Sequence, residues 1–166
     1  MTGRIKSIGA AGLLLLADQT AKFYTEKKIK GKEEKKLGSK VIIRKVYNEG
    51  ACMNLLDKYP GLVRVLSLFL SIILSLRQIW ISGRERNFLE KAGLVLLTGG
   101  AWSNTLDRCV RGHVVDYVAV ESKHTKIRKI TCNFADLFIF AGSILTVLFS
   151  GTCILEPMRY NKTERE

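Results

Sequence analysis

The stretch Gly99-Gly-Ala-Trp-Ser-Asn-Thr-Leu-Asp-Arg-Cys-Val-Arg-Gly-His-Val-Val-Asp-Tyr117 joins the end of an apolar run to a short extended segment. Its first part carries Asn104, Asp107 and Arg108 directly behind apolar residues. Ionisable side chains beside lipid are costly, so they point to a functional site. Positions 104, 107 and 108 share one helical face, which predicts that their polar atoms converge inward.

The composition indicates an integral membrane protein. Hydrophobic residues make up 47% of the 166 residues and charged residues 25%, a combination that suggests separation of the two kinds along the chain. The formal net charge of +12 fits nucleic acid, anionic lipid or the flanks of membrane spans. Long apolar runs decide in favour of the membrane, so we expect no nucleic-acid partner.

Four apolar segments predict four transmembrane helices, because about 20 residues at about 1.5 Å each cross a bilayer. The first follows Arg4 and Lys6, as in a signal peptide, but no cleavage site followed by a polar mature chain is evident. We therefore expect an uncleaved span and one integral membrane domain, 1–166, that is mainly α-helical. The expected spans are roughly 5–24, 61–82, 89–109 and 134–155.

Two segments between the spans predict a small β-element at the membrane surface. Val41 to Tyr47 and Val114 to Val120 are rich in β-branched residues, and Lys123 to Ile130 also favours extended structure. The basic stretch from Lys27 to Lys45 is interpreted as a solvated surface, with binding to anionic lipid headgroups as a second possibility. The expected β-element covers two ranges, roughly 40–56 and 113–131.

Asp116 and Asp136 are candidates for a catalytic pair. Burial at the boundary of lipid and water raises the pKa of a carboxyl, and a second carboxyl nearby raises it further. Two such groups can share one proton, one activating water while the other hydrogen-bonds a scissile carbonyl. The two residues lie twenty positions apart, and a strand excursion from one surface can bring them together.

Simpler interpretations remain open for several polar residues. Asn133 and Asp136 have the spacing of a helix cap. Asp18 and Lys22 lie four apart on one helical face, as in an ion pair at the membrane boundary. Asn48 shortly before Gly50 is, taken alone, an ordinary turn signal.

The cysteines and histidines leave a metal site as an alternative. Cys109, His113, His124 and Cys132 are ligand types of a zinc centre, but their spacing fits no compact zinc finger. A Cys/His hydrolase lacks a third, orienting group. The remaining cysteines, Cys52 and Cys153, form no Cys-x-x-Cys pair, so a disulfide framework is not expected. We predict no metal and no cofactor.

Five polar motifs occur in a fixed order along nearly the whole chain. They are Asp18-Gln-Thr-Ala-Lys22, Asn48-Glu-Gly-Ala51, Gly99-Gly-Ala-Trp-Ser-Asn104 with Asp107-Arg108, Gly112-His-Val-Val-Asp-Tyr117, and Asn133-Phe-Ala-Asp136. Each motif alone is a weak signal, whereas the ordered set is specific. It resembles the bacterial lipoprotein signal peptidases (signal peptidase II). Trp102 and Ser103 depart from the small or aliphatic residues usual in that family.

The resemblance implies an aspartic endopeptidase that removes signal peptides from prolipoproteins, cutting before a diacylglyceryl-modified cysteine. It implies Asp116 and Asp136 as the catalytic pair, lipid-modified signal peptides and membrane lipids as partners, and a monomer. The alternative is a catalytically idle relative that binds lipidated peptides or anionic lipid. The implied supporting or substrate-binding residues are Asp18, Lys22, Asn48, Gly50, Asn104, Asp107, Arg108 and Asn133.

The resemblance also implies a location in the bacterial cytoplasmic membrane, with both termini cytoplasmic and the β-element and active site near the outer surface. Charge counting argues the other way. The two loops that are expected outside carry more basic residues than the termini and the central loop together. Most of these residues lie between Lys27 and Lys45. Much of that charge is far from the span ends, where the positive-inside rule is weak.

Overall fold

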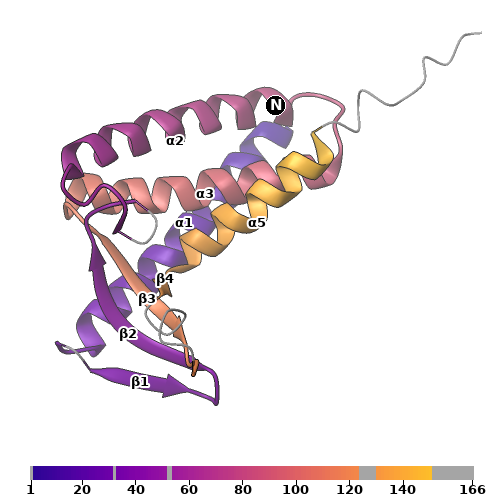
Figure 1. Cartoon of the computed structure of the whole chain (residues 1–166). Helices are drawn as coiled ribbons and strands as arrows, with labels where there is room; N and C mark the ends of the chain where they lie inside the picture. The colour runs from indigo at the N-terminus through magenta and orange to yellow at the C-terminus, as the bar shows by residue number, and fades with distance from the viewer. Residues whose placement is uncertain (1, 32, 52–53, 124–129, 151–166) are drawn as a thin grey trace, which may run out of the picture.

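The computed structural model describes residues 2–31, 33–51, 54–123 and 130–150. Four helices form a bundle, and a four-stranded antiparallel sheet in the order β1-β2-β3-β4 extends from one end of it (Figure 1). The helices are α1 (Thr2–Lys28), α2 (Pro60–Ser82), α3 (Phe88–Val110) and α5 (Phe134–Phe149). The strands are β1 (Glu34–Leu37), β2 (Val41–Asn48), β3 (Val114–Val120) and β4 (Thr131–Cys132).

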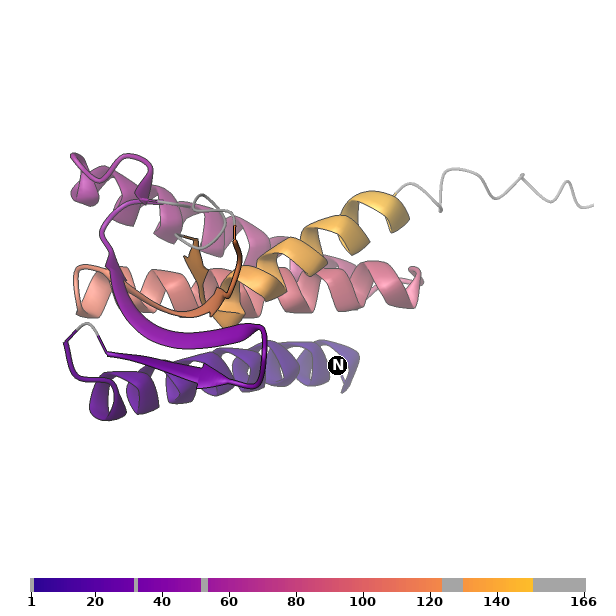
Figure 2. The same cartoon turned by 60° about the horizontal axis from the view of Figure 1, so that its bottom comes forward.

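Helix α3 is the central element, with α1 on one side and α2 on the other (Figures 1 and 2). Its contact with α5 depends on glycine. A Cβ atom on Gly100 would lie 2.6 Å from the carbonyl oxygen of Ala135, and one on Gly142 would lie 2.6 Å from that of Gly93. Small residues that let backbones approach this closely are typical of helix packing in membranes.

The start of α1 packs against the end of α2, away from the sheet. Gln78 Nε2 donates to the carbonyl oxygen of Ser7 at 2.9 Å, and Ser82 Oγ donates to Ser7 Oγ at 2.9 Å. The described N-terminus therefore lies at the end of the bundle opposite the sheet (Figure 1).

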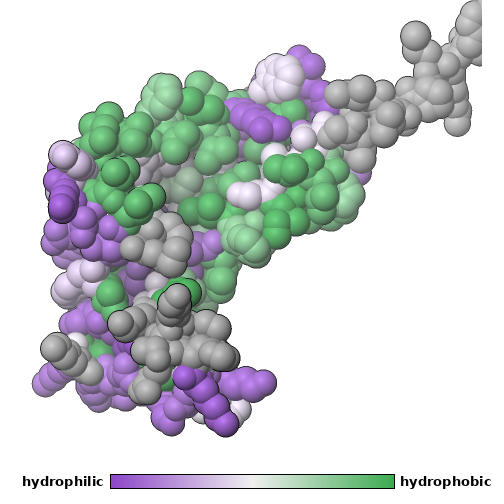
Figure 3. All heavy atoms as spheres, in the orientation of Figure 1, coloured by the Kyte–Doolittle hydropathy of each residue, from purple (hydrophilic) through white to green (hydrophobic). Residues whose placement is uncertain are grey.

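The surface is divided between apolar helices and a polar sheet. In the view of Figure 3, hydrophobic residues cover the helices and hydrophilic residues gather over the sheet. Among the described residues, α2 is the one helix whose length and composition alone suffice to cross a membrane, with a mean hydropathy of 1.8. Helix α5 is apolar over a described length of 16 residues.

The sheet brings the two surface segments together. Strands β2 and β3 pair from Val41 opposite Val120 to Asn48 opposite Val114, with an irregularity between Ile43 and Val46. This register places Asn48, at the end of β2, on the strand next to the one that carries Asp116.

Several boundaries differ from those expected. Helix α1 extends beyond 5–24 at both ends, and β2 ends at Asn48, after which none of the described residues up to 56 belongs to a strand. Strand β1 lies in the stretch interpreted as plain surface; its four side chains are all exposed, so no alternation of buried and exposed residues marks it. The predictions made for 124–129 and 151–155 fall outside the described residues, as do Cys52 and Cys153.

Candidate active site

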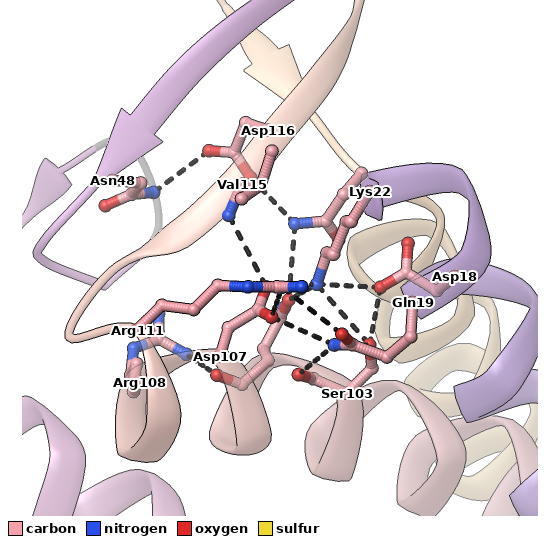
Figure 4. Close-up of polar contacts among 12 residues, drawn as sticks. Asp18, Gln19, Lys22, Asn48, Ser103, Asp107, Arg108, Arg111, Val115 and Asp116 are labelled. Atoms are coloured by element: carbon pink, nitrogen blue, oxygen red, sulfur yellow. Dashed lines mark hydrogen bonds and ion pairs between the residues drawn. The ribbon is translucent and has the colours of Figure 1, made fainter. Parts of the chain in front are cut away.

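The end of α3 carries three buried polar side chains, as its helical spacing predicts. Asn104, Asp107 and Arg108 are 6%, 1% and 9% exposed. Asp107 and Arg108 lie on the side of α3 that faces α1 and the sheet (Figure 4). Asn104 accepts from Lys22 of α1 and donates to Asp136 of α5. The stretch that begins as an apolar run therefore ends in a polar cluster inside the molecule.

Asn133 caps α5 and also joins the two aspartates. Its side-chain oxygen accepts from the backbone N–H of Asp136 at 2.9 Å, and Asp136 Oδ2 accepts from the backbone N–H of Asn133 at 3.1 Å, which is a capping box. The Asn133 amide nitrogen donates to Asp116 Oδ1 at 2.7 Å and to Asn104 Oδ1 at 3.2 Å. The capping interpretation is correct, and the same side chain has a second role.

Asp116 lies on β3 with each carboxyl oxygen bound by an amide. Its Oδ1 accepts from Asn133, and its Oδ2 accepts from Asn48 Nδ2 at 3.2 Å. Burial, followed by the charge of Asp136, raises the pKa of Asp116 from 3.8 to about 7, although the two amide hydrogen bonds oppose this shift. Asp116 is thus able to hold or release a proton near neutral pH.

Gly50 occupies a place where no side chain fits. An added Cβ atom would lie 2.4 Å from the carbonyl oxygen of Leu55 and 2.6 Å from the carbonyl carbon of Asn54. Its own carbonyl oxygen accepts from Arg108 Nη2 at 2.9 Å, and its N–H donates to Asn48 Oδ1 at 3.1 Å. The turn signal in the sequence therefore marks a loop that is fixed onto the end of α3.

Asp18 and Lys22 form an ion pair that is buried and extends to α3. Lys22 Nζ lies 2.7 Å from Asp18 Oδ2 and 2.8 Å from Asp107 Oδ2, and all three side chains are fully buried (Figure 4). The same nitrogen donates to Asn104 Oδ1 at 2.9 Å. A single cation thus links α1 to two polar residues of α3.

Sequence reasoning missed two partners of Asp107. Gln19 Nε2 donates to Asp107 Oδ1 at 3.0 Å, and Arg111 forms an ion pair with the same oxygen. The spacing held a signal for Arg111, because it lies four residues after Asp107 on the same helical face.

Asp18 also has two partners that the sequence analysis did not identify. Ser103 Oγ donates to Asp18 Oδ2 at 2.6 Å, and the Tyr117 hydroxyl donates to Asp18 Oδ1 at 2.9 Å. Burial and the charge of Asp18 raise the pKa of Tyr117, so its hydroxyl stays protonated and can donate. Tyr117 neighbours Asp116 on a strand, where side chains alternate between faces, and no pattern in the sequence indicates its contact with α1.

The described residues contain no group of three or more His, Cys, Asp or Glu side chains arranged to hold a metal ion. Of the zinc candidates, Cys109 is exposed. The centroid of the His113 ring lies 4.2 Å from the centroid of the Tyr47 ring. His124 lies outside the described residues.

One continuous network of hydrogen bonds and ion pairs joins all ten candidate site residues. It runs from α1 through α3 and the cap of α5 to β3 and the loop after β2. Its members are Asp18, Lys22, Asn48, Gly50, Asn104, Asp107, Arg108, Asp116, Asn133 and Asp136.

A bundle of helices with apolar surfaces and two linked carboxyls at the end that bears the sheet is typical of a membrane protein with a buried acidic centre. Comparison with known sequences specifies the family. The sequence model described as "Signal peptidase (SPase) II" matches residues 10–151, so the chain belongs to the signal peptidase II family.

Individual relatives agree with this assignment. A lipoprotein signal peptidase of Pseudomonas fluorescens (strain Pf0-1) is 31% identical over 88% of this chain and 87% of that protein. A lipoprotein signal peptidase of Mesorhizobium japonicum is 31% identical over 78% of this chain and 76% of that protein.

Solved structures show the same fold. One, described as a bacterial membrane enzyme structure determined by the in meso method at 2.3 Å resolution, has a TM-score of 0.72 at 22% identity and covers 97% of this chain and 93% of its own. A second, described in the same words at 1.9 Å resolution, has a TM-score of 0.69 at 21% identity and covers 91% and 93%.

Proposed function

We propose that the chain is an aspartic endopeptidase of the bacterial cytoplasmic membrane. Its substrates are prolipoproteins, whose signal peptides it cleaves before the diacylglyceryl-modified cysteine. The observation that carries this proposal is the link between Asp116 and Asp136, which Asn133 joins by its side-chain amide and its cap. The names of the related lipoprotein signal peptidases supply the substrate class.

The chemistry follows from two carboxyls that share one proton. The ionised carboxyl takes a proton from a water molecule as the water oxygen attacks the scissile carbonyl carbon. The protonated carboxyl donates its proton to the carbonyl oxygen, which gives a neutral tetrahedral intermediate. The carbon–nitrogen bond then breaks: the leaving nitrogen takes up a proton from the carboxyl that received it from water, and a hydroxyl of the intermediate returns its proton to the other carboxylate as the new carboxyl group forms. The pair returns to its starting state.

Arg108 is the candidate for holding the substrate backbone. Its Nη2 fixes the Gly50 loop at 2.9 Å, while its Nε is buried without a hydrogen-bond partner among the described residues. A buried donor left unpaired is costly. A carbonyl oxygen of a bound peptide would satisfy this nitrogen beside the aspartate pair, whose charges both act on the guanidinium.

We further propose that all four helices cross the membrane within one domain, 1–166, with both termini in the cytoplasm and the sheet outside. Exposed apolar side chains on the helices and a polar sheet support this placement (Figure 3). The described N-terminus lies at the end of the bundle opposite the sheet, which agrees with a site near the outer surface. The protein acts as a monomer, and membrane lipids surround its helices.

The test is cleavage of a lipid-modified precursor peptide by the purified protein in lipid, followed by gel shift. We expect the lipidated precursor to be cut before its modified cysteine, as mass spectrometry of the product would show, and the same peptide without lipid to remain intact. Tight binding of the lipidated peptide without cleavage would overturn the proposal in favour of an idle, lipid-binding relative.

A further inference from the structure

Lys22 donates its three N–H groups to three different acceptors. They are Asp18 Oδ2 at 2.7 Å, Asp107 Oδ2 at 2.8 Å and Asn104 Oδ1 at 2.9 Å, and the lysine side chain is fully buried. Ser103 Oγ lies farther away, at 3.4 Å. None of these hydrogen bonds reaches the aspartate pair, so Lys22 acts on that pair through its charge and through Asn104.

The contact with Lys22 fixes the orientation of the Asn104 amide. An ammonium group can only donate, so the Asn104 atom that faces it must be the oxygen. Asn133 Nδ2 donates to the same oxygen at 3.2 Å. The Asn104 nitrogen then points to Asp136 Oδ1, to which it donates at 2.9 Å. With the opposite orientation, a carbonyl oxygen would face a carboxylate.

Asp136 and Asp116 receive different kinds of hydrogen bond. Asp136 accepts from a backbone N–H at the N-terminus of α5, where the helix dipole favours negative charge, and from the amide that Lys22 polarises. Asp116 lies on a strand and accepts from the side chains of Asn48 and Asn133. Negative charge is therefore better stabilised on Asp136, and Asp116, whose pKa lies at about 7, keeps the proton.

We propose that Lys22 is a positioning residue of this peptidase, which orients the Asn104 amide so that Asp136 is the ionised base that activates water and Asp116 is the protonated acid. This assignment of roles rests on the proposed function. Other charged groups also face the pair. They are Arg108 on α3 and Asp18 on α1. Asp107 acts on Arg108 and is itself paired with Arg111.

The experiment compares Asp18→Asn with the double variant Asp18→Asn/Lys22→Met. Removing Lys22 alone would leave two buried carboxylates without their shared cation, which is strongly destabilising. In the double variant one charge of each sign is removed, and Asp107 keeps its ion pair with Arg111. The two variants differ in the cation and its contact with Asn104.

Relative to Asp18→Asn, we expect kcat of the double variant near neutral pH to fall about tenfold, with KM within about twofold. The acidic limb of its pH–rate profile should move about one unit higher, since one unit corresponds to a tenfold change in ionisation. Superimposable profiles would overturn the role of Lys22. Wild-type protein that does not cleave the lipidated precursor would instead overturn the proposed function itself.

Infrared difference spectroscopy tests the assignment without changing Lys22. At a pH of about 6, below the pKa of about 7 for Asp116, the wild-type protein should show the carbonyl stretch of a protonated carboxyl. We expect this band to disappear in Asp116→Asn and to persist in Asp136→Asn. The opposite pattern would show that Asp136 carries the proton and would overturn the inference.

Discussion

Replacing Gly50 by alanine should displace the loop that binds Arg108. The added Cβ atom would lie 2.4 Å from the carbonyl oxygen of Leu55, whereas ordinary contacts begin at 3.4 Å, so backbone atoms must move apart by about 1 Å. Because the Gly50 carbonyl accepts from Arg108 at 2.9 Å and its N–H donates to Asn48, both contacts are lengthened together.

Forcing extra volume into a packed site costs about 1–3 kcal/mol, which lowers the population of the correctly placed loop by about 5- to 150-fold. We expect kcat/KM for the lipidated precursor to fall within this range. Gly61→Ala is the matched control, because a Cβ atom at Gly61 would have no neighbour within 4 Å. The reasoning is refuted if the two variants cleave at equal rates and unfold at equal temperatures.

Three further outcomes are expected. Cleavage should decline as pH rises through about 7, because Asp116 loses its proton there, and a rate that stays constant to about pH 9 would contradict this. Gly142→Ala should lower the free energy of unfolding by about 1–3 kcal/mol, because its Cβ atom would lie 2.6 Å from the carbonyl oxygen of Gly93. The control Gly9→Ala, whose Cβ atom would have no neighbour within 4 Å, should leave the free energy of unfolding unchanged. Equal unfolding midpoints for the two variants would disprove the close packing. Metal chelators should leave cleavage unchanged, since two carboxyls activate water without a Lewis acid, and inhibition by them would revive the zinc alternative.

The features that sequence predicted well are those with a local period or cap. The spacing of Asn104, Asp107 and Arg108 predicted one buried helical face, and the spacing of three positions from Asn133 to Asp136 was consistent with a capping box, which the structure contains. In each case, residues close in sequence determine the geometry, so their spacing alone is enough to predict it.

The features that sequence missed depend on contacts between distant elements. Tyr117 reaches Asp18 across 99 positions, and Ser103 reaches it across 85. Strand β1 has four exposed residues, so pairing with β2 rather than burial of its side chains places it in the sheet. The ion pair of Asp18 and Lys22 was considered, but its burial against α3 could not be derived from spacing alone.

The most direct test of the central claim is the cleavage rate of two isosteric variants, Asp116→Asn and Asp136→Asn, each measured separately on the lipidated precursor. Loss of a general acid or base lowers a rate by about 10²- to 10⁴-fold, so the cleavage rate of each variant should fall by this factor. Each variant should still bind the precursor. If either variant cleaves at the wild-type rate, these aspartates are not the catalytic pair.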